Sequence, residues 1–331
     1  MSYLLQTEST EYALIKTLGK GATCKCYLGY EISSSNSKTP KVLAIKIFTP
    51  KFYKYYSNEV SFLSKLSSNE NIIKIYNHGE GYISPLKEKE NTNLDINKIE
   101  DESQKVNGKV YFEIMKYAIN GELKDYVQGT ETRIPEKISA KIFLTLVLIV
   151  KDLHKNNISH CDLKPENVLL GDNFRILLSD FGFSQTFNGD KGDYILHSFA
   201  GSPIYSAPET RKAYTKGFDA IKNDIFSLGV LLFVITIGRF PFHMTSFSDE
   251  KYRYIIKKNY EGFWDNFNNI EISDEFKDLI NNLINITPSQ RLEIDQILEH
   301  PWLKKYINFQ SLDNHNFIDE EVIKELSSRK G

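Results

Sequence analysis

The first third of the chain has the pattern of a series of short β-strands. Apolar runs with few charged residues occur at 12–15, 26–30, 42–48 and 110–115. Strands at this spacing predict an antiparallel sheet. The stretch 56–66 differs, because its apolar residues recur three apart, which predicts one helix among the strands.

From residue 121 onward the hydrophobic pattern becomes helical. The stretch 138–154 is apolar at helical period, and 224–237 is hydrophobic on nearly all sides, which is typical of a helix inside a core. Shorter helices are predicted at 276–286 and 295–298. The chain therefore predicts an α+β protein in which a small sheet domain precedes a larger, mainly helical domain.

Two polar stretches interrupt the predicted strands. The segment 33–41 is rich in Ser, Asn, Lys and Pro, and we expect a flexible turn there. The segment 87–109 is rich in Lys, Glu, Asp and Asn. It cannot bury enough apolar surface to offset the entropy of ordering it, so we expect a mobile insert at about 87–109.

Composition narrows the class of protein. The formal net charge of the 331 residues is −2, so we expect neither nucleic acid nor an anionic membrane as a partner. The longest apolar runs are about half the roughly 20 residues of a spanning helix, which favours buried core helices. The sparse cysteines, Cys24, Cys26 and Cys161, favour a reducing compartment. We expect a soluble intracellular protein, located in the cytoplasm, with the nucleus as the alternative.

The strongest signal is a set of motifs in a fixed order. His160-Cys161-Asp162-Leu163-Lys164-Pro165-Glu166-Asn167 is followed, eighteen residues after Asp162, by Asp180-Phe181-Gly182. Ala207-Pro208-Glu209 comes later, and Gly19-Lys20-Gly21 and Ala44-Ile45-Lys46 stand upstream. In these motifs the sequence resembles the eukaryotic protein kinase family, from about residue 12 to residue 302.

The resemblance implies the bilobal protein kinase fold. We expect an N-lobe at 1–117, built on a small antiparallel sheet with one key helix. A larger, mainly helical C-lobe is expected at 118–303. The remainder, 304–331, is expected to be a C-terminal tail with a short helix. The apolar residues of 317–326 recur at helical spacing. That helix either packs on the C-lobe or serves as an autoinhibitory or partner-binding element.

Phosphoryl transfer needs positioning and charge neutralisation more than covalent chemistry. Asp162 is the candidate base for the substrate hydroxyl, and Lys164 is the candidate positive charge beside the transferred phosphoryl group. Asn167 and Asp180 offer the hard oxygen ligands that Mg²⁺ prefers. A polar turn would explain these residue types singly, but not their spacing.

The resemblance also assigns the nucleotide phosphates to a glycine loop and a buried lysine. The loop matches the family's first two glycines, but Cys24 replaces the usual third glycine and Cys26 replaces the usual valine. The loop residues implied are Leu18, Gly19, Lys20, Gly21, Ala22, Thr23, Cys24 and Cys26. Lys46 lies in an apolar strand and therefore needs a partner. Both the phosphates of ATP and Glu59, 13 residues later, would serve.

The adenine and ribose contacts follow from the resemblance alone. Met115 resembles the gatekeeper, and Lys116, Tyr117 and Ala118 resemble the hinge whose backbone binds adenine. Ala44 and Leu169 are expected to sandwich the ring, and Glu122 to lie near the ribose. Two scaffold features are also implied: an ion pair between Glu209 and Arg291, and an anchor for the catalytic-loop backbone at Asp224.

Two features bear on subgroup and regulation. Lys164 follows the serine/threonine pattern. Gly201-Ser202-Pro203 and His300-Pro301-Trp302 resemble the calcium/calmodulin-dependent and AMP-activated kinase group. Cys161 replaces the arginine that pairs with an activation-loop phosphate in many kinases, although Ser198 aligns with a phosphorylated position. We therefore hypothesise that phosphate on Ser198 changes activity only modestly. A redox role for Cys24 and Cys161 is the alternative to a merely tolerated small residue.

The sequence thus predicts an ATP- and Mg²⁺-dependent protein serine/threonine kinase. Glu122 and Glu166 match family positions that contact basic substrates, which predicts a mild preference for Arg at the third residue before the target. A pseudokinase that scaffolds partners without catalysis and a small-molecule kinase of similar fold are the alternatives. The substrate protein, the upstream activator and the oligomeric state stay open.

Overall fold

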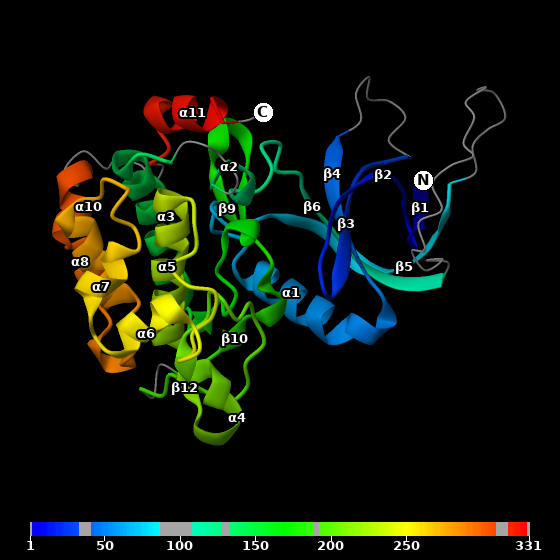
Figure 1. Cartoon of the computed structure of the whole chain (residues 1–331). Coiled ribbons are helices and arrows are strands. Elements are labelled where there is room, and N and C mark those ends of the chain that lie inside the picture. The colour runs from blue at the N-terminus through cyan, green and yellow to red at the C-terminus, as the bar shows by residue number, and fades with distance from the viewer. Residues whose placement is uncertain are drawn as a thin grey trace. The chain divides into compact units, whose positions relative to one another are not determined.

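The computed structural model describes residues 2–32, 41–86, 108–127, 133–188, 192–308 and 317–329. The chain forms two compact units (Figure 1). The first comprises residues 1–68 and 73–117, and the second comprises residues 69–72 and 118–331. The predicted turn at 33–41 and insert at 87–109 lie outside the described residues, apart from Lys41, Gly108 and Lys109.

The strands of the first unit close into a barrel in the order β1-β2-β3-β4-β6-β5, and every pairing is antiparallel. The elements are β1 (Tyr3–Gln6), β2 (Glu11–Lys20), β3 (Cys24–Glu31), β4 (Val42–Phe48), η1 (Pro50–Phe52), α1 (Tyr53–Lys65), β5 (Ile75–Pro85) and β6 (Gly108–Lys116). The four strands predicted from apolar runs are all present.

Closure of the barrel depends on two strands that the hydrophobic pattern did not reveal. β1 pairs with β2 on one side and with β5 on the other, so that Leu5 lies opposite Tyr12 and Ile83. Gly81 permits the contact with β5, because a Cβ there would lie 2.7 Å from the carbonyl oxygen of Gln6. The sheet is therefore a closed barrel, and its six strands, as far as the structure describes this unit, leave no unpaired edge.

The barrel is filled by the apolar side chains that alternate along its strands. Its core cluster consists of Leu5, Tyr12, Leu14, Tyr27, Leu43, Ile45, Ile47, Ile83, Val110, Phe112 and Ile114. α1 packs alongside and buries Tyr56, Glu59, Phe62 and Leu63, which recur at the three- and four-residue spacing of one helix face. Glu59 is therefore carried on the buried face of its helix.

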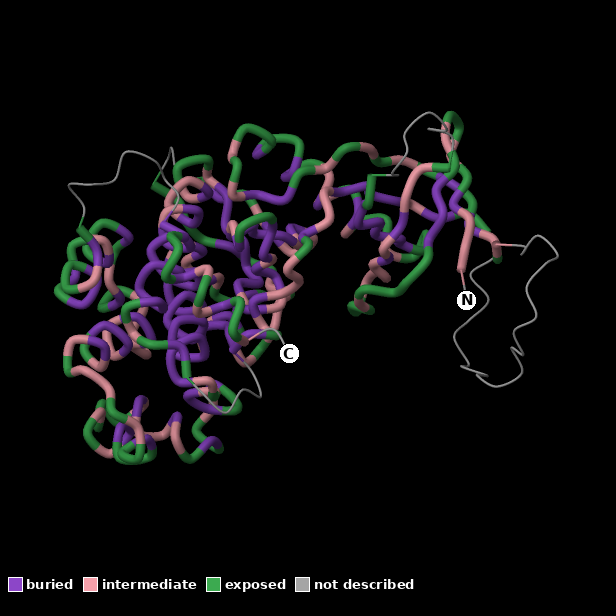
Figure 2. Tube along the Cα trace, turned by 90° about the horizontal axis from the view of Figure 1, so that it is seen from above, coloured by how far each residue is buried: buried purple, intermediate pink, exposed green. Residues whose placement is uncertain are grey.

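The second unit is built around the long helices α3 (Glu136–Lys155) and α5 (Ala220–Ile237), which pack against each other. Every residue of α5 except Ile221 is buried. α5 is long and apolar enough to cross a membrane, but 94% of it is buried within the protein, as expected for a core helix. Figure 2 shows the buried backbone running through the interior of this unit.

Local signals set the ends of α5. The side chain of Asp219 accepts the backbone N–H of Lys222, which caps the first turn, and Gly238 ends the helix with φ 74°. The helix therefore begins four residues before Asp224, which the sequence pattern had taken as its start.

Shorter elements complete the second unit. The helices are α2 (Lys124–Val127), α4 (Ala213–Lys216), α6 (Glu250–Ile256), α7 (Tyr260–Asp265), α8 (Asp274–Leu283), α9 (Ile294–Leu298), α10 (Pro301–Tyr306) and α11 (Glu320–Ser327). The two-stranded pairs are β7 (Ile158–Ser159) with β10 (Gln185–Thr186), β8 (Val168–Leu170) with β9 (Ile176–Leu178), and β11 (Ile195–Leu196) with β12 (Phe218–Asp219).

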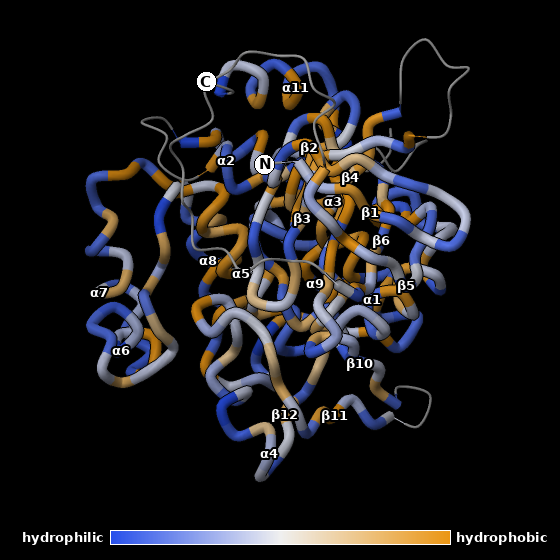
Figure 3. The backbone as a smooth tube through the Cα atoms, turned by 90° about the vertical axis from the view of Figure 1, so that its right-hand side faces the viewer, coloured by the Kyte–Doolittle hydropathy of each residue, from blue (hydrophilic) through white to orange (hydrophobic). Residues whose placement is uncertain are grey.

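The C-terminal helix α11 packs on α3. Hydrophobic and hydrophilic residues alternate along it (Figure 3), and Val322 and Leu326 are buried. Lys141 of α3 reaches Asp319 at 2.6 Å and Glu321 at 2.8 Å. Burial alone would lower the pKa of Lys141, but the two carboxylates hold it above its usual value. The predicted tail helix is thus present and is held to the second unit by charge as well as by apolar contact.

Candidate active site

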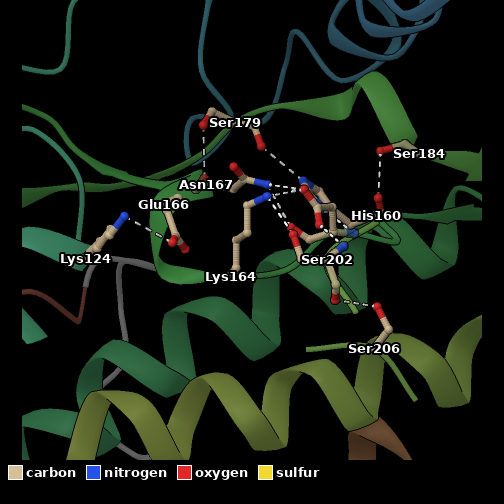
Figure 4. A network of polar contacts seen from close by, with 10 residues as sticks. Lys124, His160, Lys164, Glu166, Asn167, Ser179, Ser184, Ser202 and Ser206 are labelled. Atoms are coloured by element: carbon tan, nitrogen blue, oxygen red, sulfur yellow. Dashed lines mark hydrogen bonds and ion pairs between the residues drawn. The ribbon is translucent and has the colours of Figure 1, made fainter. Parts of the chain in front are cut away.

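The carboxylate of Asp162 accepts hydrogen bonds from three residues, Lys164, Asn167 and Ser202, which Figure 4 labels. Its Oδ2 accepts from Lys164 Nζ at 2.6 Å and from Asn167 Nδ2 at 3.1 Å, and its Oδ1 accepts the backbone N–H of Ser202 at 2.8 Å. The Lys164 ammonium also donates to Ser202 Oγ at 2.9 Å. Asp162 is 2% exposed, so its orientation is fixed by these donors.

Ser202 was not among the predicted site residues, although its motif was noted. The structure places its backbone and its hydroxyl on the two charged residues of the catalytic loop. The segment containing Ser202 is therefore tied directly to Asp162 and Lys164. The signal in the sequence was its place seven residues before Glu209, in the motif shared with serine/threonine kinases.

Asn167 and Asp180 carry the oxygen atoms predicted for a metal. Asn167 donates its amide to the backbone oxygen of Asp162 at 2.8 Å, so the amide's orientation is set from its nitrogen side. Asp180 has the left-handed backbone angle φ 64°, which is sparsely populated for a residue with a side chain. One amide oxygen and one carboxylate fit Mg²⁺, which takes few protein ligands and completes its shell with phosphate oxygens and water.

The catalytic loop is anchored from beneath by Asp224. Its fully buried carboxylate accepts the backbone N–H groups of His160 and Cys161, both at 3.1 Å, as the resemblance implied. His160 accepts the Asp162 N–H with Nδ1 at 3.3 Å and contacts the Ser179 carbonyl through Nε2 at 3.1 Å. Burial lowers the pKa of His160, which keeps the ring neutral. His160 is therefore a structural residue.

A buried ion pair holds the end of the activation segment, the segment that ends with Ala207-Pro208-Glu209. Arg291 donates to both carboxylate oxygens of Glu209, at 2.6 and 2.9 Å. The guanidinium is fully buried and also donates to the carbonyls of Asn285 and Lys222. The predicted pair is present, and its bidentate geometry is the strong form of this contact.

Cys161 lies in an apolar cluster instead of a phosphate-binding pocket. It packs with Phe187, Leu196, Ala213, Phe218 and Ala220. Burial raises the pKa of its thiol, and the Asp224 carboxylate raises it further. A buried thiol of this kind stays protonated, so the geometry gives no support to the redox alternative at Cys161.

Ser198 is exposed and faces an amide. Its hydroxyl donates to Gln185 Oε1 at 3.1 Å, and Gln185 Nε2 donates back to the Ser198 carbonyl at 2.8 Å. The activation segment is thus connected here by neutral contacts.

In the first unit, Lys46 forms the ion pair expected from its burial. Its Nζ lies 2.6 Å from Glu59 Oε1, and both residues are buried. The strand pairings place Gly19, Cys26 and Lys46 in one row across β2, β3 and β4. Directly paired residues share a face of the sheet, so the glycine loop and the lysine serve the same face.

The glycine loop is the hairpin between β2 and β3. Gly21 donates its N–H to the carbonyl of Cys24 at 2.9 Å, which closes the turn. A Cβ on Gly19 would meet no atom within 4 Å, so no neighbouring side chain prevents a phosphate group from approaching the backbone here. The remaining predicted loop residues, Leu18, Lys20, Ala22 and Thr23, flank this turn on the same hairpin.

The row that contains Lys46 continues to a residue that the sequence analysis missed. Glu113 of β6 lies opposite Lys46 in the ladder and is fully buried. The pKa of Tyr56 is raised to about 12, mainly by burial of its hydroxyl and next by the negative charge of Glu113. An acidic residue inside the apolar run 110–115 was the available signal.

The predicted gatekeeper and sandwich residues of this unit are neighbours. Met115 pairs with Ala44 across β6 and β4, and both are buried. Lys116 donates its N–H to the carbonyl of Lys74 at 2.9 Å, so any contact of Lys116 with adenine must use another group.

Three further predicted residues belong to the second unit. Ala118 is buried, and its carbonyl accepts the Gly121 N–H at 3.0 Å. Glu122 forms a bridge with Leu169 of β8, which sets these two residues side by side. The pKa of Glu122 is raised by burial and by the neighbouring carboxylates of Asp125 and Glu166. Lys124 and Lys164 act in the opposite direction.

The geometry around Asp162 agrees with a comparison of the whole sequence with protein-family models. The protein kinase domain model matches residues 12–303. The chain belongs to the protein kinase family. The bilobal α+β fold and the resemblance to serine/threonine kinases inferred from the motifs are thereby confirmed.

Two proteins that resemble the chain come from plants. CBL-interacting serine/threonine-protein kinase 12 of Arabidopsis thaliana is 30% identical over 323 residues, which is 94% of this chain and 57% of that protein. CBL-interacting protein kinase 2 of Oryza sativa subsp. japonica is 30% identical over 304 residues, which is 91% of this chain and 60% of that protein. The chain thus spans about three fifths of the length of these relatives.

Proposed function

We propose that this kinase domain transfers the γ-phosphoryl group of ATP to serine or threonine hydroxyls of protein substrates. The observation that carries the proposal is the arrangement around Asp162: a buried carboxylate oriented by Lys164, Asn167 and Ser202. The names of the relatives support the same reaction.

The roles of the residues follow from the chemistry. The substrate oxygen forms a bond to the γ-phosphorus as the bond between that phosphorus and the ADP oxygen breaks. Asp162 orients the attacking hydroxyl and accepts its proton late in the reaction. Lys164 supplies a fixed positive charge close to Asp162, and Lys46, oriented by Glu59, is assigned to the ATP phosphates.

Asn167 and Asp180 are the residues that would hold Mg²⁺, and the ion would neutralise charge on the ATP phosphates when bound. The scaffold alternative lacks support from the site, because Lys46, Asp162, Asn167 and Asp180 are all present. The relatives' names describe an interaction with CBL, but the chain spans only part of their length. We therefore carry over the kinase activity and no partner.

The test is ATP- and Mg²⁺-dependent phosphorylation of a basic serine peptide by the wild type and by Asp162→Asn. Loss of the base should lower kcat by about 10²–10⁴-fold. The matched control is Asp265→Asn, which changes an exposed aspartate at the end of α7 and should leave kcat unchanged. A wild-type protein that binds ATP but transfers no phosphate would contradict the proposal.

A preference for Arg at the third residue before the target is part of the proposal. Its support is that Glu122 and Glu166 lie in the second unit together with Asp162 and Lys164, and that their carboxylates interact. A peptide array without any preference for basic residues would contradict it.

A further inference from the structure

Two glutamates and a lysine face one another beside the catalytic loop. The bridge between Glu122 and Leu169 brings the segment before α2 next to β8, and Glu166 lies in the turn just before β8. The Leu123 N–H donates to the Val168 carbonyl at 2.8 Å, which fixes this alignment. The backbone therefore holds Glu122 and Glu166 together.

Lys124 is the cation of this group. Its Nζ lies 3.4 Å from Glu166 Oε1, as Figure 4 shows. The side chains are 41% and 30% exposed. An ion pair at this distance and exposure is weak and easily exchanged.

Two buried polar atoms of the second unit have no hydrogen-bond partner among the described residues. One is the second oxygen of Glu166, Oε2, and the other is the hydroxyl of Tyr205. Tyr205 is 3% exposed, and its ring packs edge-on against Phe240 at 5.5 Å. Buried polar groups are almost always hydrogen-bonded, so each of these two atoms can still take a hydrogen bond.

The charges of Glu166 and of the catalytic base act on the hydroxyl of Tyr205. Burial raises the pKa of Tyr205, and the negative charges of Glu166 and Asp162 raise it further. The Tyr205 N–H donates to the carbonyl of Ser202, whose own N–H is bound to Asp162. Tyr205 is therefore linked through the backbone of Ser202 to the catalytic base.

We infer that Lys124 is a specificity-determining residue that pairs with Glu166 until a cationic side chain of the substrate displaces it. This inference rests on the proposed function. A guanidinium suits Glu166 best, because its planar N–H groups can donate to both oxygens of one carboxylate. Lys124 lowers the affinity that a substrate arginine adds, because the incoming arginine must first displace Lys124 from Glu166.

The experiment compares two serine peptides that differ only at the third residue before the target, which is Arg in one and Gln in the other. The ratio of kcat/KM values is measured for the wild type and for Lys124→Met, which keeps the length of the side chain but removes its charge. An exposed ion pair is worth up to about fivefold, or about 1 kcal/mol. The ratio should therefore rise by about three- to fivefold in Lys124→Met, through KM.

The matched control is Lys155→Met, which removes an exposed lysine at the end of α3. Its ratio should equal that of the wild type. An unchanged ratio in Lys124→Met would overturn the inference.

Binding separates this inference from the proposed function. Fluorescently labelled versions of the two peptides, with alanine at the target, report affinity by anisotropy and need no transfer. A larger Arg-to-Gln contrast in Lys124→Met supports the inference even if no phosphate is transferred, and that result would count against the proposed function alone. An equal contrast in both proteins overturns the inference whether or not the domain is active.

Discussion

Replacement of Ser198 by alanine tests how the activation segment is held. The hydroxyl donates one hydrogen bond to Gln185, and that bond is exposed and neutral. A second bond, from Gln185 to the Ser198 carbonyl, survives the substitution. Such a side-chain bond contributes about 0.5–1.5 kcal/mol, so its loss should change kcat/KM by at most about tenfold.

The position of Cys161 gives the same expectation for a phosphate on Ser198. Where an arginine in that place would pair with phosphate, this chain has a buried thiol packed against Phe187, Leu196 and Phe218. The cluster orders the segment through apolar burial, which needs no modification. Phosphorylated and unphosphorylated protein should therefore have kcat values within about tenfold of each other.

The assay measures kcat and KM for wild-type protein before and after phosphatase treatment, with the state of Ser198 read by mass spectrometry. Ser198→Ala is measured beside Ser202→Ala, because Ser202 contacts Lys164 at 2.9 Å and its removal should lower kcat. A loss of more than about tenfold in Ser198→Ala, matched by the same loss on phosphatase treatment, would refute the reasoning.

Three further predictions concern stability and reactivity. Leu5→Ala should lower the free energy of unfolding by about 2–5 kcal/mol, because the Leu5 side chain is fully buried in the barrel. The control is Gln6→Ala at the exposed neighbouring position. Equal melting temperatures for the two variants would contradict closure of the barrel by β1. Glu209→Ala should lower the free energy of unfolding by about 3–5 kcal/mol, because the buried charge of Arg291 loses its carboxylate partner. Urea unfolding measures this change, and a change below about 0.5 kcal/mol would contradict the prediction. Cys161 should resist alkylation in the native protein and react after unfolding, since burial raises the pKa of its thiol; rapid native labelling, located by peptide mass spectrometry, would show that it is accessible.

The sequence by itself determined the elements whose pattern is strong. The four apolar strands were readable, and so were the two long helices of the second unit, because each carries a long periodic or continuous apolar pattern. The ion pairs of Lys46 with Glu59 and of Arg291 with Glu209 were predicted from motif positions. The physical reason is that a buried charge is unfavourable without an oppositely charged partner, so both residues of the pair must be present in the sequence.

Tertiary structure alone decided the features that depend on distant segments meeting. β1 has only four residues and gains its place through pairing with β5, far along the chain, so no local pattern marks it. The placement of Ser202 on Asp162, and of Cys161 among aromatic rings, likewise arises from contacts between separate segments. Lys124 reads in the sequence as an ordinary helix lysine. Only the fold shows that it stands against Glu166, because the bridge between Glu122 and Leu169 brings the two segments together.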